Sequence, residues 1–369
     1  MKGWSYVYTG ANQPFEAREY PVPEVDANGI LVRVMVSSIC GSDLHGWHGE
    51  TPRSPITIMG HEMTGQVERL GANVKTDAAG QPLAEGDRIV YSYFYPCRRC
   101  DPCLANDTHH CESRRIGAGR SQSDKPPHFT GAYAEYFYLR PGHFVLRTPD
   151  HLTDRMVAPL NCALAQVIYG LGQVDLSAGE CVVIQGAGGL GLYATAVARE
   201  AGATNIVVLD KRQDRLVLAK EFGADHVLNV DDFESPERRV EAVADLTGGG
   251  GHVVAELVGH HSVLTEGIQM ARNEGRYLVI GNISHKHTIP FNPSWLVHQN
   301  RRMVGVGGYQ AWSLRRGLEL LQRNGDRYPF EKVLSQLYPI AEINSAFAEA
   351  DKSTAIRTGL VCDPKLAQI

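Results

Sequence analysis

The chain lacks the charge pattern that nucleic-acid binding requires. It has 36 Lys and Arg residues against 41 Asp and Glu, a net charge of −5, and no run of basic residues forms a positive stripe. Proteins bind phosphate backbones through clustered Lys and Arg side chains. Nucleic acid is therefore not an expected partner.

Long apolar runs are also missing. No window approaches the roughly 18 apolar residues that a membrane span needs, and residues 1–6 show neither an apolar segment nor a cleavage site. We therefore expect no membrane association and a cytoplasmic location. With 369 residues, the chain exceeds the roughly 250 to 300 residues at which a single core stops growing, which predicts two domains.

Cysteine is sparse except in one short segment. Four of the eight cysteines, Cys97, Cys100, Cys103 and Cys111, lie within fifteen residues. In a reducing compartment such a cluster is more typical of a metal site than of disulfide bonds. Four thiolates complete a closed tetrahedral site, so the lobe of about residues 95–113 is predicted to hold a structural zinc ion. An iron–sulfur cluster is the alternative, but the spacing after Cys103 departs from the ferredoxin run.

A second group of metal-binding residue types lies upstream. Cys40 is followed in the same short stretch by His61 and Glu62. A thiol, an imidazole and a carboxylate are ligands of zinc, and a catalytic zinc ion keeps one position open for water or substrate. The alternative is a half-buried free thiol and a core histidine.

Three polar side chains follow the first thiol. Ser42 and His45 are near enough to Cys40 in the sequence to carry a proton outward. Asp43 is placed to hydrogen-bond and orient an imidazole that binds metal.

Residues 1 to about 160 predict a β-rich unit, because short apolar runs alternate with turn residues. A strand over residues 30–36 ends just before Cys40, and another over residues 65–71 begins just after Glu62. The candidate ligands are therefore expected at strand ends and in loops.

From about residue 160 to 310, strand and helix patterns alternate. The apolar run 181–185 leads into the glycine-rich loop 186–191, a helix follows, and the next strand ends at Asp210, nineteen positions after the loop. This is the context of a dinucleotide fingerprint, whose glycines admit the pyrophosphate and whose acid binds the ribose. The predicted cofactor-binding residues are Gly186, Gly188, Gly189, Leu190, Gly191 and Asp210. Further strands at 226–229, 253–258, 277–281 and 303–306 predict a doubly wound parallel sheet.

Together these motifs resemble those of the zinc-dependent medium-chain alcohol and polyol dehydrogenases. The resemblance spans nearly the whole chain and includes Ile356-Arg357-Thr358 near its end. It implies an α/β protein with a GroES-like β-rich catalytic domain, residues 1–160 and 311–369. A Rossmann dinucleotide-binding domain, residues 161–310, interrupts it, and the catalytic zinc lies in the cleft between the two.

The resemblance also implies roles for single residues. Cys40, His61 and Cys162 would hold the catalytic zinc, and Glu62 would either bind it or lie behind it. For Cys162 the alternative is a buried core thiol. The polyol branch commonly has a carboxylate at that position, and the alcohol branch often has a basic residue where this chain has Gly41, so the features of the two branches are mixed.

Two arginines match cofactor contacts of the family. Arg215 corresponds to a basic residue at the adenosine ribose and Arg357 to an arginine at the phosphates. The alternative for both is a solvated surface charge.

The expected function is hydride transfer between an alcohol and NAD, with the reverse reduction of a carbonyl, using two zinc ions per chain. Ser42, the cofactor ribose and His45 would relay the released proton, and Asp210 would favour NAD over NADP. Aromatic residues favour a bulky secondary alcohol as substrate, and the family implies a homodimer or homotetramer. The aromatic residues are Trp47, Tyr91, Tyr93, Phe94, Trp295 and Trp312.

Two alternative functions are weaker. A zinc-free carbonyl or quinone reductase of the same fold would not need Cys40, His61 and Cys162. A non-catalytic zinc-ribbon binding module with a nucleotide-sensing domain would not need a metal site with an open position.

Overall fold

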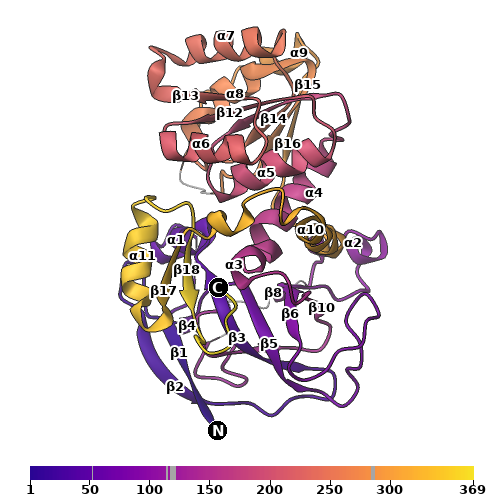
Figure 1. Ribbon diagram of the computed structural model, residues 1–369, viewed down its shortest axis with the longest axis vertical. Coiled ribbons are helices and arrows are strands. Elements are labelled where there is room, and N and C mark those ends of the chain that lie inside the picture. The colour runs from indigo at the N-terminus through magenta and orange to yellow at the C-terminus, as the bar shows by residue number, and fades with distance from the viewer. Residues whose placement is uncertain (52, 114, 117–121, 284–286) are drawn as a thin grey trace. The chain divides into compact units, whose positions relative to one another are not determined.

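A computed structural model describes residues 1–51, 53–113, 115–116, 122–283 and 287–369. The chain forms two compact units (Figure 1). The first contains Met1–Cys162, Gln310–Asp326 and Phe330–Ile369, and the second contains Ala163–Tyr309 and Arg327–Pro329. In the part of the chain described, no helix has the length and apolar character needed to span a membrane.

The first unit is built on a seven-stranded sheet with the order β10-β6-β5-β3-β18-β17, in which β9 also pairs with β3. Its central strand β3 is buried along almost its whole length, with only Arg33 partly exposed, as expected for an apolar run covered on both faces. The last strand, β18, returns to pair antiparallel with β3, with Gly359 opposite Ser38. The strands are β3 (Ile30–Ser38), β5 (Glu62–Leu70), β6 (Arg88–Ser92), β9 (Tyr136–Leu139), β10 (Phe144–Arg147), β17 (Gln336–Pro339) and β18 (Thr358–Val361).

Smaller elements complete this unit. A three-stranded sheet contains β1 (Lys2–Tyr8), β2 (Glu16–Pro21) and β4 (Thr57–Ile58), and β7 (Phe94–Tyr95) pairs with β8 (Arg115–Ile116). The helices are α1 (Gly41–Trp47), α2 (Asp101–Leu104), α3 (Asp154–Val157), α10 (Ala311–Asn324) and α11 (Ile343–Asp351). Helix α10 buries Leu314, Leu318 and Leu321, which recur at helical spacing on one face.

A buried ion pair ties the C-terminal segment to this unit. The Asp154 carboxylate, fully buried, accepts hydrogen bonds from Arg88 Nη2 at 2.7 Å, Thr64 Oγ1 at 2.8 Å and the backbone N–H of Gln368 at 2.7 Å. Arg88 Nη1 in turn donates to the side-chain oxygen of Gln368 at 2.8 Å. Several hydrogen bonds therefore compensate the burial of both charges.

The second unit contains a six-stranded parallel sheet with the order β13-β12-β11-β14-β15-β16. This order reverses between β11 and β14, as in a dinucleotide-binding sheet, so the predicted doubly wound fold is confirmed. In Figure 1, α7 and α8 cover one face of this sheet and α5 the other. The strands are β11 (Cys181–Gln185), β12 (Asn205–Asp210), β13 (His226–Asn229), β14 (Gly251–Glu256), β15 (Ala271–Val279) and β16 (Arg302–Gly305). The helices are α4 (Ala165–Gln173), α5 (Gly189–Glu200), α6 (Gln213–Glu221), α7 (Pro236–Thr247), α8 (Leu264–Met270) and α9 (Ser294–Val297).

Three predicted strands in this unit have wrong bounds: β14 and β15 end at Glu256 and Val279 rather than at 258 and 281, and β16 spans Arg302–Gly305 rather than 303–306. Strand β14 begins at Gly251 and β15 at Ala271, earlier than the residues 253 and 277 expected from the sequence. The glycine run before β14 allows the early start, because Gly250 has φ +108° and a Cβ there would lie 2.7 Å from the Met270 carbonyl oxygen. Only glycine fits so close to another backbone.

Candidate metal centre and cofactor loop

Cys40 lies at the junction of β3 and α1, where it is the N-cap residue of the helix. Its backbone N–H donates to Asp43 Oδ2 at 3.1 Å, an arrangement that fixes the first turn of α1. The end of a rigid strand and a capped helix therefore hold the Cys40 thiol.

His61 and Glu62 lie at the start of β5. Gly60 before them has φ +83°, and a Cβ there would meet the Tyr133 ring at 2.7 Å. The carbonyl oxygen of His61 accepts hydrogen bonds from Tyr91 Oη at 2.8 Å and Asn161 Nδ2 at 2.9 Å. The backbone at the two candidate ligands is therefore held from several sides.

Cys162 lies in a short π-helical segment, Leu160–Leu164. Such segments widen a helix locally and are frequent at functional sites. The Tyr93 hydroxyl donates to Cys162 Sγ at 3.7 Å, and the Tyr93 and His61 rings are 4.9 Å apart in an edge-to-face arrangement. Cys162 is thus held at the same end of the sheet as His61.

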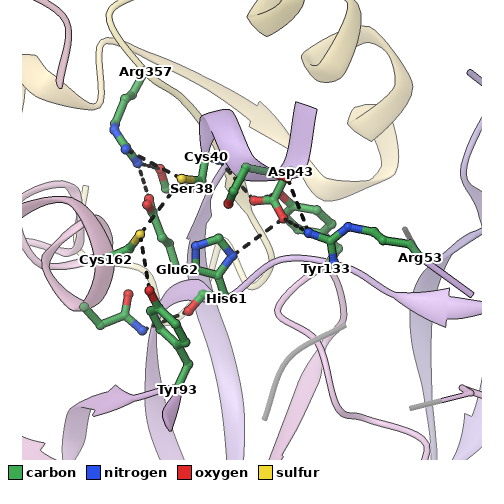
Figure 2. Close-up of polar contacts among 12 residues, drawn as sticks. Ser38, Cys40, Asp43, Arg53, His61, Glu62, Tyr93, Tyr133, Cys162 and Arg357 are labelled. Carbon is green, nitrogen blue, oxygen red and sulfur yellow. Dashed lines mark hydrogen bonds and ion pairs between the residues drawn. The ribbon is translucent and has the colours of Figure 1, made fainter. Parts of the chain in front are cut away.

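The structure brings these four side chains together (Figure 2). One ligand atom from each of Cys40, His61, Glu62 and Cys162 lies within 4.8 Å of the others. The two sulfur atoms are 4.0 Å apart, close to the roughly 3.8 Å expected for two thiolates bound 2.3 Å from a tetrahedral zinc ion. The four groups therefore fit one zinc ion.

The two carboxylate oxygens of Glu62 have different surroundings. Its Oε2 pairs with the Arg357 guanidinium, while its buried Oε1 has no hydrogen-bond partner among the residues described. Arg357 Nη1 also donates to Ser38 Oγ at 3.2 Å. A buried carboxylate oxygen without a partner is costly, and a nearby cation would remove that cost.

The electrostatics of the cluster also favour a cation. Burial raises the pKa of Glu62 to about 7, although Arg357 opposes this. The hydrogen bond between the two thiols lowers the pKa of Cys40 and raises that of Cys162. Burial lowers the pKa of His61, but the charges of Asp43 and the Cys40 thiolate outweigh burial and raise it. Closely spaced anionic groups hinder one another's ionisation, and a divalent ion relieves this.

Asp43 lies beside His61, but at a distance longer than the hydrogen bond that the sequence predicted. Its Oδ1 is 3.6 Å from His61 Nδ1, and its Oδ2 accepts a hydrogen bond from Tyr133 Oη at 3.0 Å. Arg53 Nη2 lies 3.9 Å from Oδ1 (Figure 2). The carboxylate faces Nδ1 of the imidazole, which leaves Nε2 for a metal ion.

The second predicted metal group also converges. One sulfur from each of Cys97, Cys100, Cys103 and Cys111 lies within 4.8 Å of the others. Cys100 and Cys111 Sγ are 3.8 Å apart, and the backbone N–H of Cys97 donates to Cys111 Sγ at 3.2 Å. The donor set is that of a closed zinc site.

A third group of possible ligands was not expected from the sequence. Asp107 has one oxygen 2.9 Å from His109 Nδ1 and the other 2.8 Å from His110 Nδ1. The contact with His110 is a hydrogen bond.

The glycine-rich loop joins β11 to α5. Gly186 has φ +97°, and a Cβ at Gly191 would lie 1.8 Å from the Gly186 carbonyl oxygen, so neither position accepts a side chain. Gly188 is the N-cap of α5, which begins at Gly189 and continues through Leu190. The first amides of the helix remain available to phosphate oxygens.

Asp210, at the end of β12, contacts this loop directly. Its Oδ2 accepts a hydrogen bond from the Ala187 N–H at 2.7 Å and its Oδ1 from the Arg212 N–H at 2.9 Å. Arg215 lies beside the loop, because a Cβ at Gly188 would be 3.8 Å from its Nη1. The structure thus brings the predicted cofactor-binding residues of this unit together.

Two predicted residues have unexpected surroundings. Arg357 lies beside the four candidate ligands and pairs with Glu62, and its predicted contact with cofactor phosphates stays a prediction. His45 Nδ1 lies 2.5 Å from Glu50 Oε2, a partner that the sequence did not suggest.

Comparison with known proteins identifies the family. The alcohol dehydrogenase GroES-like domain matches residues 26–150, and the zinc-binding dehydrogenase domain matches residues 189–323. The chain is 33% identical to the 5-exo-hydroxycamphor dehydrogenase of Pseudomonas putida over 90% of this chain and 91% of that protein. It belongs to the zinc-dependent medium-chain alcohol dehydrogenase family.

Other similar proteins agree with this assignment. An L-threonine 3-dehydrogenase of Bacillus subtilis is 30% identical over 89% of this chain and 90% of its own length. The crystal structure of an alcohol dehydrogenase from Thermotoga maritima has a TM-score of 0.92 and 30% identity, and the match covers 98% of this chain and 99% of that one. The protein is thus a zinc-dependent alcohol dehydrogenase that uses a nicotinamide dinucleotide.

The sequence contains no signal for several side chains around the four candidate zinc ligands of the dehydrogenase. Ser38, Arg53 and Tyr133 contact the cluster or Asp43 from separate elements. Their residue types are common throughout the chain, and no local motif marks them. The sequence indicates Tyr93 only as part of an aromatic wall and gives no sign of its hydrogen bond to Cys162.

Proposed function

We propose that this dehydrogenase oxidises a secondary alcohol of partly apolar character with NAD as the hydride acceptor. The first unit would be the catalytic domain, residues 1–160 and 311–369, and residues 161–310 the dinucleotide-binding domain. The observation that carries the proposal is the buried cluster of two thiols, an imidazole and a carboxylate, in which one carboxylate oxygen has no hydrogen-bond partner among the described residues.

In this proposal Cys40, His61 and Cys162 hold the catalytic zinc, with Glu62 as an additional or exchanging ligand. When bound, zinc supplies Lewis-acid polarisation of the substrate oxygen, and the nicotinamide ring supplies the acceptor carbon for the hydride. Arg357 holds Glu62 through one oxygen, and the other oxygen has no hydrogen-bond partner among the residues described. Asp43 keeps the His61 ring in place.

The proton of the alcohol needs a path out of the site. Ser42 and His45 lie three residues apart on α1 and therefore on one side of the helix. In the proposal the Ser42 hydroxyl accepts the substrate proton while it donates its own proton to a hydroxyl of the cofactor ribose, and His45 accepts a proton from that ribose at Nε2 and delivers it to water.

Aromatic side chains support an apolar substrate. The Tyr93 and Phe94 rings pack at a tilt of 45°, with their centroids 4.3 Å apart, and Tyr93 contacts both His61 and Cys162. Similar proteins are named for a hydroxycamphor and for threonine, both of which carry a hydroxyl group on a secondary carbon. These observations favour a secondary alcohol beside an aromatic wall.

The remaining properties follow the family. We propose two zinc ions per chain, with the structural ion held by Cys97, Cys100, Cys103 and Cys111. We also propose a cytoplasmic homodimer or homotetramer. The sheet edge at β16 supports association, because Met303 on this strand is 39% exposed and free strand edges pair readily. Light scattering on the purified protein would measure the mass of the assembly.

A paired screen of primary and secondary alcohols, followed by NADH absorbance, tests the main proposal. Bulky secondary alcohols should give the highest kcat/KM, and the Cys162→Ser variant should lose that activity. Equal activity on primary and secondary alcohols would contradict the substrate class. Full activity of Cys162→Ser would contradict the metal assignment.

A further inference from the structure

The contact between His45 and Glu50 is built by the local chain path. Helix α1 ends after Trp47, and Gly49 then adopts φ +72°, where a Cβ would meet Ala11 at 2.9 Å. The backbone N–H of Glu50 donates to the His45 carbonyl oxygen at 2.9 Å. This turn reverses the chain and brings the Glu50 carboxylate back to Nδ1 of the histidine.

The contact determines how His45 can handle a proton. A carboxylate only accepts hydrogen bonds, so Nδ1 must carry the hydrogen in the 2.5 Å contact. In the neutral ring, Nε2 then has the free lone pair. A relay residue needs this arrangement, with one ring nitrogen fixed and the other ready to accept.

We infer that Glu50 is a positioning residue of the proton relay, which keeps His45 Nε2 as the acceptor and offsets the positive charge of the ring while it carries the proton. The inference rests on the relay proposed above. His45 and Glu50 have side chains that are 27% and 25% exposed, so the pair is partly shielded from water. Partial shielding strengthens the attraction between opposite charges.

The proton balance is simple. The alcohol loses a hydride to the nicotinamide and a proton through Ser42, and His45 gains one proton at Nε2 while it keeps its proton on Nδ1. The doubly protonated ring then releases a proton to water and returns to its neutral form. Glu50 accepts a hydrogen bond throughout and does not itself transfer a proton.

The chain offers a matched control pair on the same helix end. His48 Nε2 lies 2.6 Å from Asp351 Oδ1, with side chains 33% and 43% exposed. This pair has the same chemistry and no place in the proposed relay. Asp351→Asn therefore measures what the loss of a histidine–carboxylate pair does to the fold alone.

Steady-state kinetics on the zinc-loaded enzyme test the inference. Glu50→Gln removes the charge but keeps an acceptor oxygen, and should lower kcat for alcohol oxidation about fivefold with KM nearly unchanged, whereas Asp351→Asn should leave kcat unchanged. A larger solvent isotope effect on kcat should accompany the Glu50→Gln change, because proton transfer becomes more rate-limiting. Melting temperature and zinc content show whether each variant is folded and loaded.

A double-mutant cycle separates this inference from the relay itself. If Glu50 acts through His45, then Glu50→Gln should cost nothing in a His45→Ala background. A further loss in that background, or an unchanged kcat for Glu50→Gln alone, would overturn the role of Glu50 and leave the relay intact. An unchanged kcat for His45→Ala would instead overturn the relay.

Discussion

Replacement of Asp210 by serine should weaken the preference of the enzyme for NAD over NADP. Both oxygens of this carboxylate accept backbone hydrogen bonds, from Ala187 at 2.7 Å and Arg212 at 2.9 Å. The charge is therefore fixed at the glycine-rich loop, where the adenosine ribose is expected. A 2′-phosphate would meet that charge, while the ribose hydroxyls of NAD can donate to its remaining lone pairs.

The basic side chains next to Asp210 are less able to compensate. The guanidinium of Arg212 is already paired with Asp214, with Nη2 to Oδ2 at 2.7 Å. A lost hydrogen bond and an added like-charge contact together cost about 2.7 kcal/mol, which corresponds to a preference for NAD of about 10²-fold in kcat/KM. Asp210→Ser removes the repulsion, so the ratio should fall to within about tenfold.

The assay compares kcat/KM for the two cofactors at one salt concentration. Asp214→Asn is the matched control, because it releases Arg212 without changing Asp210. It should improve the use of NADP less than about threefold if repulsion by Asp210 dominates the choice. A wild-type enzyme with equal or better use of NADP, or an Asp210→Ser variant with an unchanged ratio, would refute this reasoning.

Three further predictions concern metal content, catalysis and stability. Elemental analysis should find two zinc ions per chain, and a single ion, or iron, would contradict this. Cys40→Ser should abolish activity with little loss of stability, whereas Cys100→Ser should mainly lower the melting temperature. Ser42→Ala should lower kcat by about 10²-fold or more while zinc content stays unchanged, and wild-type turnover would remove Ser42 from the relay. Asp154→Ala leaves the buried Arg88 charge without its counter-ion and should lower the free energy of unfolding by about 3 to 5 kcal/mol, measured with denaturant. The exposed pair of Lys2 and Glu19 provides the control, because Glu19→Ala should cost about 1 kcal/mol or less.

Local patterns predicted the parallel sheet well. Strand β13 has the predicted bounds, and α5 follows the glycine loop as expected. The start of β15 was missed because residues 272–275 read Arg-Asn-Glu-Gly, a polar run ending in glycine that is typical of a turn. In the structure only Ala271 pairs with Gly251 before the regular ladder resumes at Arg276, and the polar run lies in the irregularity between them, where Glu274 has φ +60°.

The metal cluster could be predicted only in part. Cys40, His61 and Glu62 are close in the sequence, and their residue types indicate zinc. Cys162 is 122 residues from Cys40, so only the resemblance to a family joined them. The contact of Glu50 with His45 could not be predicted, because it depends on the left-handed conformation of Gly49. In the sequence, an isolated glutamate after a helix resembles a solvated charge.

Because β18 returns from the C-terminal end of the chain to pair with β3, the first unit can complete its sheet only late in synthesis. Arg357 follows Glu62 by 295 residues, which at translation rates of 5 to 20 residues per second is an interval of roughly 15 to 60 s. During that time the ribosome produces the entire second unit, and its sheet can close while the first unit still lacks an inner strand. Cys40, His61 and Cys162 are therefore all synthesised well before Arg357. A zinc ion that binds them during synthesis would meet a Glu62 carboxylate that does not yet have Arg357 as its ion-pair partner.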